Sequence, residues 1–183
     1  KSNNRYQINQ IQYFITSVKI HVKNGTYVPI SSKKDWQYVD KDIVSSLKWD
    51  ITTDLDSTSI DSISFVFGFN EAENKSYRFK NPPENLMFWP DVLGGGYHYM
   101  KINIMHGNDE AALNWFNCHL GIGQLYNEKK EVTGFVHNCF SVSLPVDLNI
   151  SKSTKPEIAI QMNIEKWFDN VHTIDFNLYD GIM

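Results

Sequence analysis

The feature that most constrains the fold of this chain is a repeated alternation of apolar and polar residues with a period of two. It recurs in five segments: 11–22, 62–69, 97–105, 140–150 and 157–164. Successive side chains of a β-strand point to opposite faces, so this period predicts half-buried strands. The apolar face of an amphipathic helix would instead repeat about every 3.6 residues. The pattern predicts an all-β fold, an antiparallel β-sandwich of the immunoglobulin-like type.

Turn and bulge signals refine this prediction. Asn24-Gly25 is a strong two-residue hairpin signal, because both residues tolerate a positive φ. The alternation within 11–22 slips between Ile15 and Val18. Such a slip predicts a β-bulge near Thr16 and Ser17.

Helical signals are few. Acidic residues near the start of 107–116 favour a short helix over 108–116. A second short helix is predicted near 163–168. The segment 71–96 is the longest irregular stretch, and long loops inside compact domains usually carry function.

Composition limits the class of protein. The chain has 183 residues, 42% of them hydrophobic, and a net charge of −4. This length suits one domain, which we expect to span 1–183. The 17 basic residues do not cluster, which argues against nucleic-acid binding. The longest apolar runs are too short for a membrane-spanning helix.

The two cysteines share one predicted hairpin. If the polar segment 127–130 is its tip, Cys118 lies directly opposite Cys139 on the paired strand. Opposed side chains can lie close enough for a disulfide, with Cα atoms within about 7 Å. A disulfide would indicate an oxidising compartment. The alternative is two buried free thiols.

Motifs of enzymes are scarce. The sequence contains no GxSxG, P-loop, HExxH or CxxC motif, and no pair of carboxylates stands out as an acid–base couple. We therefore predict that the chain is not an enzyme.

The segment 85–107 holds the most unusual combination of residues. Trp89 precedes a proline, three glycines follow, and His98 lies between two tyrosines. His98 shares its predicted strand face with apolar residues, so a buried imidazole there needs a hydrogen-bond partner or a metal. His119 follows Cys118, and His172 follows the second helix-like segment. A single histidine is more often a surface or core residue than a ligand, but histidine, methionine and tryptophan together suit copper better than calcium or magnesium.

A resemblance to a known family rests on a series of motifs: "YFITSVKI", "YVD", "ISFVFGFN", "LMFWPDVLGGGYHYMKI", "HLG" and "WFDNVHTIDFNLYDGIM". Their order and spacing resemble the methanobactin-partner (MbnP-like) domain, and more narrowly its lipoprotein members from Bacteroidetes. The resemblance runs from about Tyr13 to Met183. Its most specific pieces are Met-x-Trp, the following Gly-Tyr-x-x-x-Lys, and His-Leu-Gly.

The resemblance implies a periplasmic or outer-membrane-anchored copper-binding protein of copper homeostasis, with a lipid anchor N-terminal to this chain. It also implies a partner, a di-haem protein of the cytochrome c peroxidase/MauG type. In the methanotroph branch that partner oxidises the first tryptophan of a Trp-x-Trp motif to kynurenine, and the product helps to bind one copper ion. Trp89 matches this tryptophan, and Asp91 stands where the motif has its second one. His119 matches the family's histidine, and His98 and His172 fall in similar segments.

These residues define an expected site. We expect Trp89 to be partly accessible at the sheet edge, with His98 or His119 close enough to share one copper ion with it after oxidation. Asp91 is the nearest candidate acceptor for the second N–H of a ligating imidazole. The competing hypothesis is an interaction or adhesion module that binds no metal, in which Trp89 only fills the core.

Overall fold

The alternating segments form an all-β structure in the computed structural model, which describes residues 5–53, 55, 57–109, 113–151, 155–168 and 174–183. Within these residues the strands are β1 (Tyr6–Val22), β2 (Thr26–Pro29), β3 (Trp36–Asp40), β4 (Thr58–Phe67), β5 (Met100–His106), β6 (Asn114–Leu120), β7 (Ile122–Tyr126), β8 (Val132–His137), β9 (Phe140–Ile150) and β10 (Gly181–Ile182). Short 3₁₀ turns join them: η1 (Val44–Leu47), η2 (Glu84–Met87), η3 (Asp91–Leu93) and η4 (Ile164–Trp167). The predicted all-β class is confirmed, and the open sheets are consistent with a sandwich.

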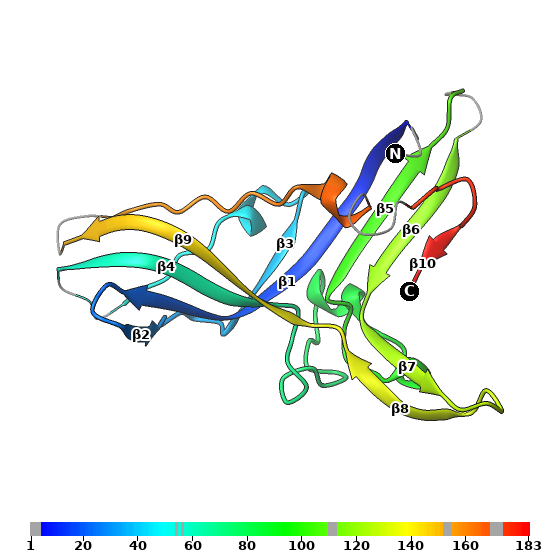
Figure 1. Ribbon diagram of the computed structural model, residues 1–183, viewed down its shortest axis with the longest axis horizontal. Helices are drawn as coiled ribbons and strands as arrows, with labels where there is room; N and C mark the ends of the chain where they lie inside the picture. The colour runs from blue at the N-terminus through cyan, green and yellow to red at the C-terminus, as the bar shows by residue number, and fades with distance from the viewer. Residues whose placement is uncertain (1–4, 54, 56, 110–112, 152–154, 169–173) are drawn as a thin grey trace.

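The long strand β1 organises the larger sheet. The strand order is β10-β6-β5-β1-β4-β9, with β2 and β3 also paired to β1, while β7 and β8 form a separate hairpin. The first half of β1 pairs with β5 and its second half with β4, both antiparallel. The sheet therefore divides into two wings that share β1 (Figure 1). Only the short β10 pairs in parallel with its neighbour, β6, among the described strands.

A β-bulge marks the point where β1 passes from one wing to the other. Ser17 has a φ of 53°, and the register with β4 shifts between Thr16 and Lys19. The Thr16 hydroxyl donates to the Gly68 carbonyl at 2.9 Å, which ties the end of β4 to this point. The predicted bulge is confirmed. The nearby hairpin signal is also confirmed, although its turn uses the three residues between Val22 and Thr26.

Two predictions of local structure are wrong. The expected helix over 108–116 is replaced from Asn114 onward by β6, which pairs with β5 so that Trp115 faces Met105; residues 110–112 lie outside the described residues. The expected strand over 157–164 pairs with nothing among the described strands. Its Ile158 and Ile160 are 37% and 44% exposed. Alternation indicates that a segment can present one apolar face, but a strand also needs a neighbouring strand to pair with. Among the described strands, this segment has no such neighbour. The second helix prediction is confirmed in part, since η4 is a 3₁₀ turn that Asn163 caps.

The predicted pairing of the cysteines is also wrong. The hairpin tip lies at the predicted polar segment, but β7 and β8 pair so that Ile122 faces His137. Cys118 belongs to β6, opposite Ile102 of β5, and Cys139 lies between β8 and β9. Both are free thiols. The chain leaves β6 at Gly121 before the hairpin begins. Residues 118 and 139 therefore do not belong to one continuous hairpin, and they are not paired.

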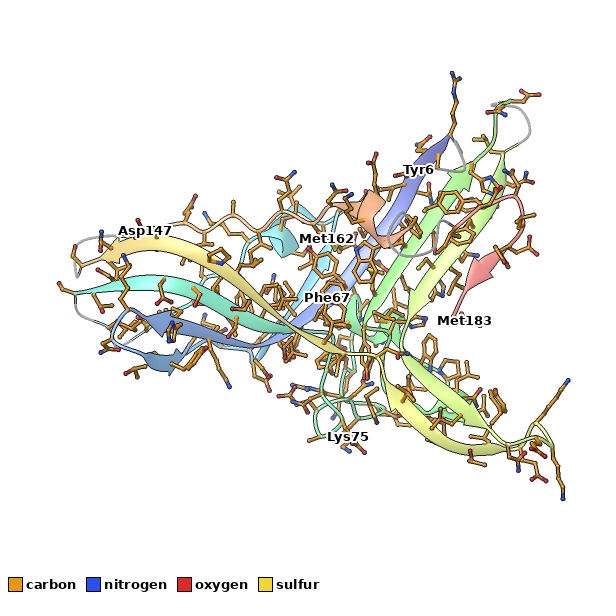
Figure 2. All side chains as sticks on the ribbon, in the orientation of Figure 1. Tyr6, Phe67, Lys75, Asp147, Met162 and Met183 are labelled. Carbon is orange, nitrogen blue, oxygen red and sulfur yellow. The ribbon has the colours of Figure 1, made fainter. Side chains whose placement is uncertain are left out.

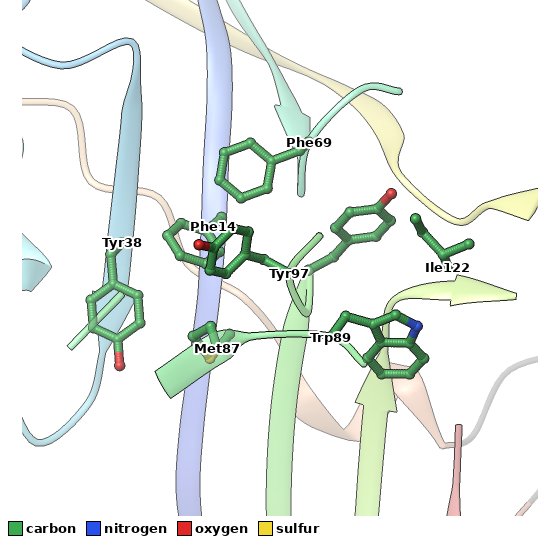
Figure 3. Close-up of a cluster of buried hydrophobic side chains, with 8 residues drawn as sticks. Phe14, Tyr38, Phe69, Met87, Trp89, Tyr97 and Ile122 are labelled. Atoms are coloured by element: carbon green, nitrogen blue, oxygen red, sulfur yellow. The ribbon is translucent and has the colours of Figure 1, made fainter. Parts of the chain in front are cut away.

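The buried side chains form three clusters. One lies at the junction of the two wings, shown in Figure 3, and contains Phe14, Tyr38, Phe69, Met87, Trp89, Tyr97, Tyr99 and Ile122. A second packs β5 and β6 against the C-terminal segment, and a third lies between β1 and β4. Figure 2 shows side chains gathered most densely where the wings meet. The irregular stretch 68–99 thus contributes to the core instead of lying over it.

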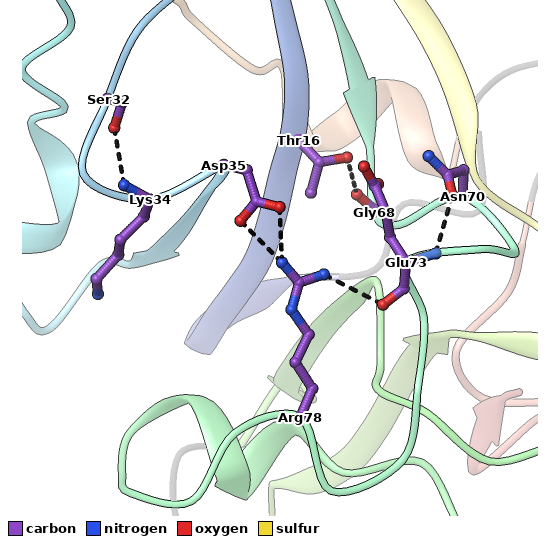
Figure 4. A network of polar contacts seen from close by, with 8 residues as sticks. All are labelled: Thr16, Ser32, Lys34, Asp35, Gly68, Asn70, Glu73 and Arg78. Carbon is purple, nitrogen blue, oxygen red and sulfur yellow. Dashed lines mark hydrogen bonds and ion pairs between the residues drawn. The ribbon is translucent and has the colours of Figure 1, made fainter.

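Polar contacts fix this irregular stretch to the sheet (Figure 4). Arg78 donates from Nη2 to both carboxylate oxygens of Asp35, at 2.8 and 3.0 Å, and from Nη1 to the Glu73 carbonyl at 3.1 Å. The Glu73 backbone N–H donates to the Asn70 side chain at 3.0 Å. The loop that carries Trp89 is therefore anchored at its start. Among the described residues we find no helix long and apolar enough to cross a membrane.

Candidate metal centre

The turn after Trp89 is closed by its own backbone. The Trp89 N–H donates to the Gly96 carbonyl at 2.9 Å, and the Gly95 N–H donates to the Pro90 carbonyl at 3.1 Å. Gly95 has a φ of 72° and Gly96 of 80°, a region that side chains disfavour. A Cβ on Gly95 would also lie 2.7 Å from the Ser76 Oγ. The glycines therefore let the chain return beside Trp89, as the sequence predicted.

Trp89 itself is buried, with 3% of its surface exposed, so the prediction of partial accessibility is wrong. Its indole Nε1–H donates to the Leu93 carbonyl at 3.1 Å. The reason for burial lies far along the chain: a Cβ on Gly121 would lie 2.7 Å from the indole Cδ2 and Cε3 atoms. Because Gly121 has no side chain, the corner between β6 and β7 closes over the ring, and Ile122 joins the same cluster.

Three aromatic rings follow one another from Trp89 toward the sheet. The centroid of the His98 imidazole lies 4.6 Å from that of the Trp89 ring, with the planes at 82°. The His119 imidazole lies 5.1 Å from His98, again at 82°. The predicted proximity of Trp89 to an imidazole is confirmed. His98 precedes β5 instead of lying within it, and His119 belongs to β6.

Each imidazole is oriented by a hydrogen bond to one nitrogen. His98 Nδ1 lies 3.0 Å from the Met87 carbonyl, which can only accept, so Nδ1 carries the proton. His119 Nε2 lies 2.9 Å from the Asn103 Oδ1, and the Asn103 amide donates in turn to Gln10 at 2.8 Å. In each neutral ring the opposite nitrogen keeps its lone pair, and a hydrogen bond to the other nitrogen is what holds metal-ligating histidines in place.

Both rings are neutral at pH 7. Burial lowers the pKa of His98 from 6.5 to about 4, because an imidazolium is poorly solvated there. Burial also lowers the pKa of His119, and the charge of Lys101 adds to this effect. A neutral imidazole is the form that binds a metal ion.

A cavity of about 260 Å³ adjoins the row of rings. Its lining includes Trp89, His119, Met100, Cys118 and Asn138. Burial raises the pKa of the Cys118 thiol to about 11, so this cysteine is protonated at pH 7. The described residues that line the cavity therefore offer neutral nitrogen and sulfur atoms and no carboxylate side chain.

The donor set fits copper in its chemistry. Imidazole and thioether groups bind copper, and hard cations such as calcium prefer oxygen ligands. His98 and His119 are the residues that would hold the ion, with Trp89 beside them. Within the described part of the chain, no three His, Cys, Asp or Glu side chains gather into a metal site. His172, the fourth predicted ligand, lies outside the described residues.

Asp91 does not play the predicted part. Its carboxylate accepts hydrogen bonds from the Ser76 hydroxyl at 2.6 Å and from the Tyr77 hydroxyl at 2.8 Å. These bonds lower its pKa and hold it on the outer side of the turn. The Met87 carbonyl and Asn103 take the role expected of Asp91, because they accept from the two imidazoles.

Sequence reasoning missed three residues of this site. Asn103 and Lys101 alternate with the apolar residues of β5 and lie on the face of His119. Gly121 is the third. The Gly-Tyr-x-x-x-Lys motif contained one signal, since its lysine is Lys101.

The fold and site define an all-β protein with two neighbouring imidazoles beside a buried tryptophan. The family model described as MbnP matches residues 1–183, the whole chain, and the protein belongs to the MbnP family. This membership is consistent with a methanobactin-related, copper-associated role. No curated protein and no solved structure matches the chain significantly.

Proposed function

We propose that this protein is a non-catalytic copper-binding protein in which His98 and His119 hold one copper ion beside Trp89. The observation that carries the proposal is the row of three rings, with centroid distances of 4.6 and 5.1 Å. Two imidazoles at this spacing, each oriented by a hydrogen bond on one nitrogen, support a shared ion.

Copper would be bound here as cargo or as a resident ion, with no reaction catalysed by the chain. The described residues supply neutral donors and no acid–base couple at the site. Trp89, as an indole, offers only an N–H donor, and Leu93 already accepts from it. Unmodified protein should therefore bind copper weakly.

We further propose that Trp89 is the substrate of a di-haem protein of the cytochrome c peroxidase/MauG type. With that partner as catalyst and two equivalents of peroxide as the oxidant, cleavage of the indole C2–C3 bond would place one oxygen atom on each carbon and release two waters. Hydrolysis of the resulting N-formyl group would release formate and leave an aniline nitrogen and a ketone oxygen, and either atom is a better ligand than an indole. The position of Trp89 beside His98 supports this step, as does the cavity that the ring lines.

Membership of the MbnP family also supports a proposal about where in the cell the protein acts. We propose that the protein is secreted to the periplasm or anchored to the outer membrane by a lipid that precedes this chain, and that it serves copper homeostasis there. Its partner would then be a periplasmic di-haem protein.

Metal analysis tests this function. The chain is produced with and without a di-haem protein of the cytochrome c peroxidase/MauG type, and copper per chain is measured together with the intact mass. We expect close to one copper per chain and a mass change localised to Trp89 after co-production. Matched variants His98→Gln and His119→Gln should lose copper, while His137→Gln, on β8, should retain it. Copper that persists in both variants would refute the proposed ligands.

A second candidate, protein binding without metal, is favoured by one observation. The β7–β8 hairpin exposes five large apolar side chains, each by 42% or more: Leu125, Tyr126, Val132, Phe135 and Val136. Exposed apolar groups of this kind mark interaction surfaces. The test is the double variant Leu125→Ser with Phe135→Ser. Loss of self-association or partner capture in this variant, together with absence of copper from all preparations, would support protein binding as the function.

A further inference from the structure

Lys101 lies directly beside one of the two imidazoles. In the antiparallel register of β5 and β6, Lys101 is opposite His119, so the two side chains share a face of the sheet. Directly opposed residues have Cβ atoms about 5 Å apart. Burial lowers the pKa of the Lys101 ammonium group, which lies in the immediate surroundings of His119.

The ammonium group is also anchored to the turn that holds the other imidazole. Lys101 Nζ donates to the Leu86 carbonyl at 2.8 Å, and the next carbonyl, of Met87, accepts from His98 Nδ1. Both backbone acceptors belong to η2. Lys101 thus connects the strand of His119 to the turn of His98.

No carboxylate is paired with this ammonium group among the ion pairs of the described residues. The row across the sheet runs from His119 through Lys101 to Gln12 and then Asp40. Asp40 is two strand spacings from Lys101, about 10 Å. Its carboxylate accepts from Gln12 at 2.7 Å and from the Tyr38 hydroxyl at 2.8 Å. With respect to the described residues, the positive charge of Lys101 therefore acts on the site with little compensation.

From this geometry, and resting on the proposed copper function, we infer that Lys101 is a specificity-determining residue that makes the site prefer Cu(I) over Cu(II). A fixed positive charge repels a bound cation in proportion to the charge of that ion. A repulsion that weakens binding of a singly charged ion about tenfold weakens binding of a doubly charged ion about a hundredfold.

Three lysine variants test the inference. Lys101→Gln removes the charge and keeps an N–H donor for Leu86, Lys101→Met removes both, and Lys101→Arg keeps the charge. Lys129→Gln removes one charge at the hairpin tip and serves as the matched control. Each is prepared by co-production with the di-haem protein, its fold is checked by circular dichroism, and its affinities for Cu(I) and Cu(II) are measured by competition with chromophoric chelators.

We expect both neutral variants to bind Cu(II) about a hundredfold more tightly and Cu(I) about tenfold more tightly than the wild type. The Cu(II)/Cu(I) potential should then fall by about 59 mV, the value of a tenfold ratio for one electron. The arginine variant and the control should match the wild type. Equal changes for both ions, or none, would overturn the role of Lys101 and leave the proposed function intact. If the wild type binds neither ion, both proposals fail. If one neutral variant does not fold, the other neutral variant decides.

Discussion

The His98 imidazole and the Trp89 ring lie nearly perpendicular, at 82°, with centroids 4.6 Å apart, and the turn through η3 and the three glycines brings them together. Both side chains are buried, Trp89 to 3% and His98 to 7% exposure. A buried imidazole is stable when it is neutral and when its nitrogen atoms are hydrogen-bonded or bound to a metal.

The burial of His98 predicts a pH dependence of stability. Its pKa in the folded protein is about 4, below the ordinary value of 6.5, so the unfolded chain binds more protons between these values. The stability present above pH 6.5 should fall by about 3 kcal/mol as the pH drops toward 4. Urea unfolding at pH 7 and at pH 4.5 measures the change. In His98→Gln this part of the pH dependence should be absent; an unchanged dependence in the variant would contradict the assignment.

The close approach of Gly121 to Trp89 predicts a specific cost of adding a methyl group. The new Cβ would lie 2.7 Å from the indole, so Gly121→Ala should displace the ring and destabilise the fold by roughly 1–3 kcal/mol. Tryptophan fluorescence and urea unfolding report the two effects. Gly134→Ala is the control, because its Cβ would make an ordinary contact of 3.6 Å with Leu125. Equal behaviour of the two variants would show that Gly121 does not set the position of Trp89.

The free state of the cysteines predicts their reactivity. Burial raises the pKa of Cys118 to about 11 from 9.0, so its thiolate at pH 8 is about a hundredfold scarcer than that of an ordinary cysteine. The native protein should therefore label slowly at Cys118, measured in Cys139→Ser. Denatured wild-type protein without reductant should show both thiols. Loss of both thiols in that assay would support the disulfide expected from the sequence and contradict the observed register.

Part of this structure could be read from the sequence, and the limits have physical causes. The period-two pattern specified strands and the bulge near Ser17, because both depend on local alternation. The partner of each strand depends on distant residues, which is why the local pattern predicts a strand over 157–164 and a helix over 108–116 that the described residues do not form. Acidic residues near a helix start also occur in loops, and β6 begins only at Asn114.

The candidate site shows the same division. The glycines after Trp89 and the nearby His98 indicated a close turn, which the structure contains. The burial of Trp89 depends on Gly121, and the contact of His98 with His119 depends on the approach of β5 to β6. These relationships join segments far apart in the chain, so no spacing in the sequence could indicate them. The Gly-Tyr-x-x-x-Lys motif includes Lys101, but the position of this lysine beside His119 is a matter of strand register.

The central claim is that one copper ion is bound between His98 and His119, beside Trp89. Anomalous diffraction at the copper absorption edge, from crystals of the co-produced protein, tests it most directly. We predict one anomalous peak at bonding distance, about 2 Å, from an imidazole nitrogen of each histidine. A peak at His21, His106 or His137 would contradict the claim. So would the absence of a peak between these two rings in crystals of protein that binds copper in solution.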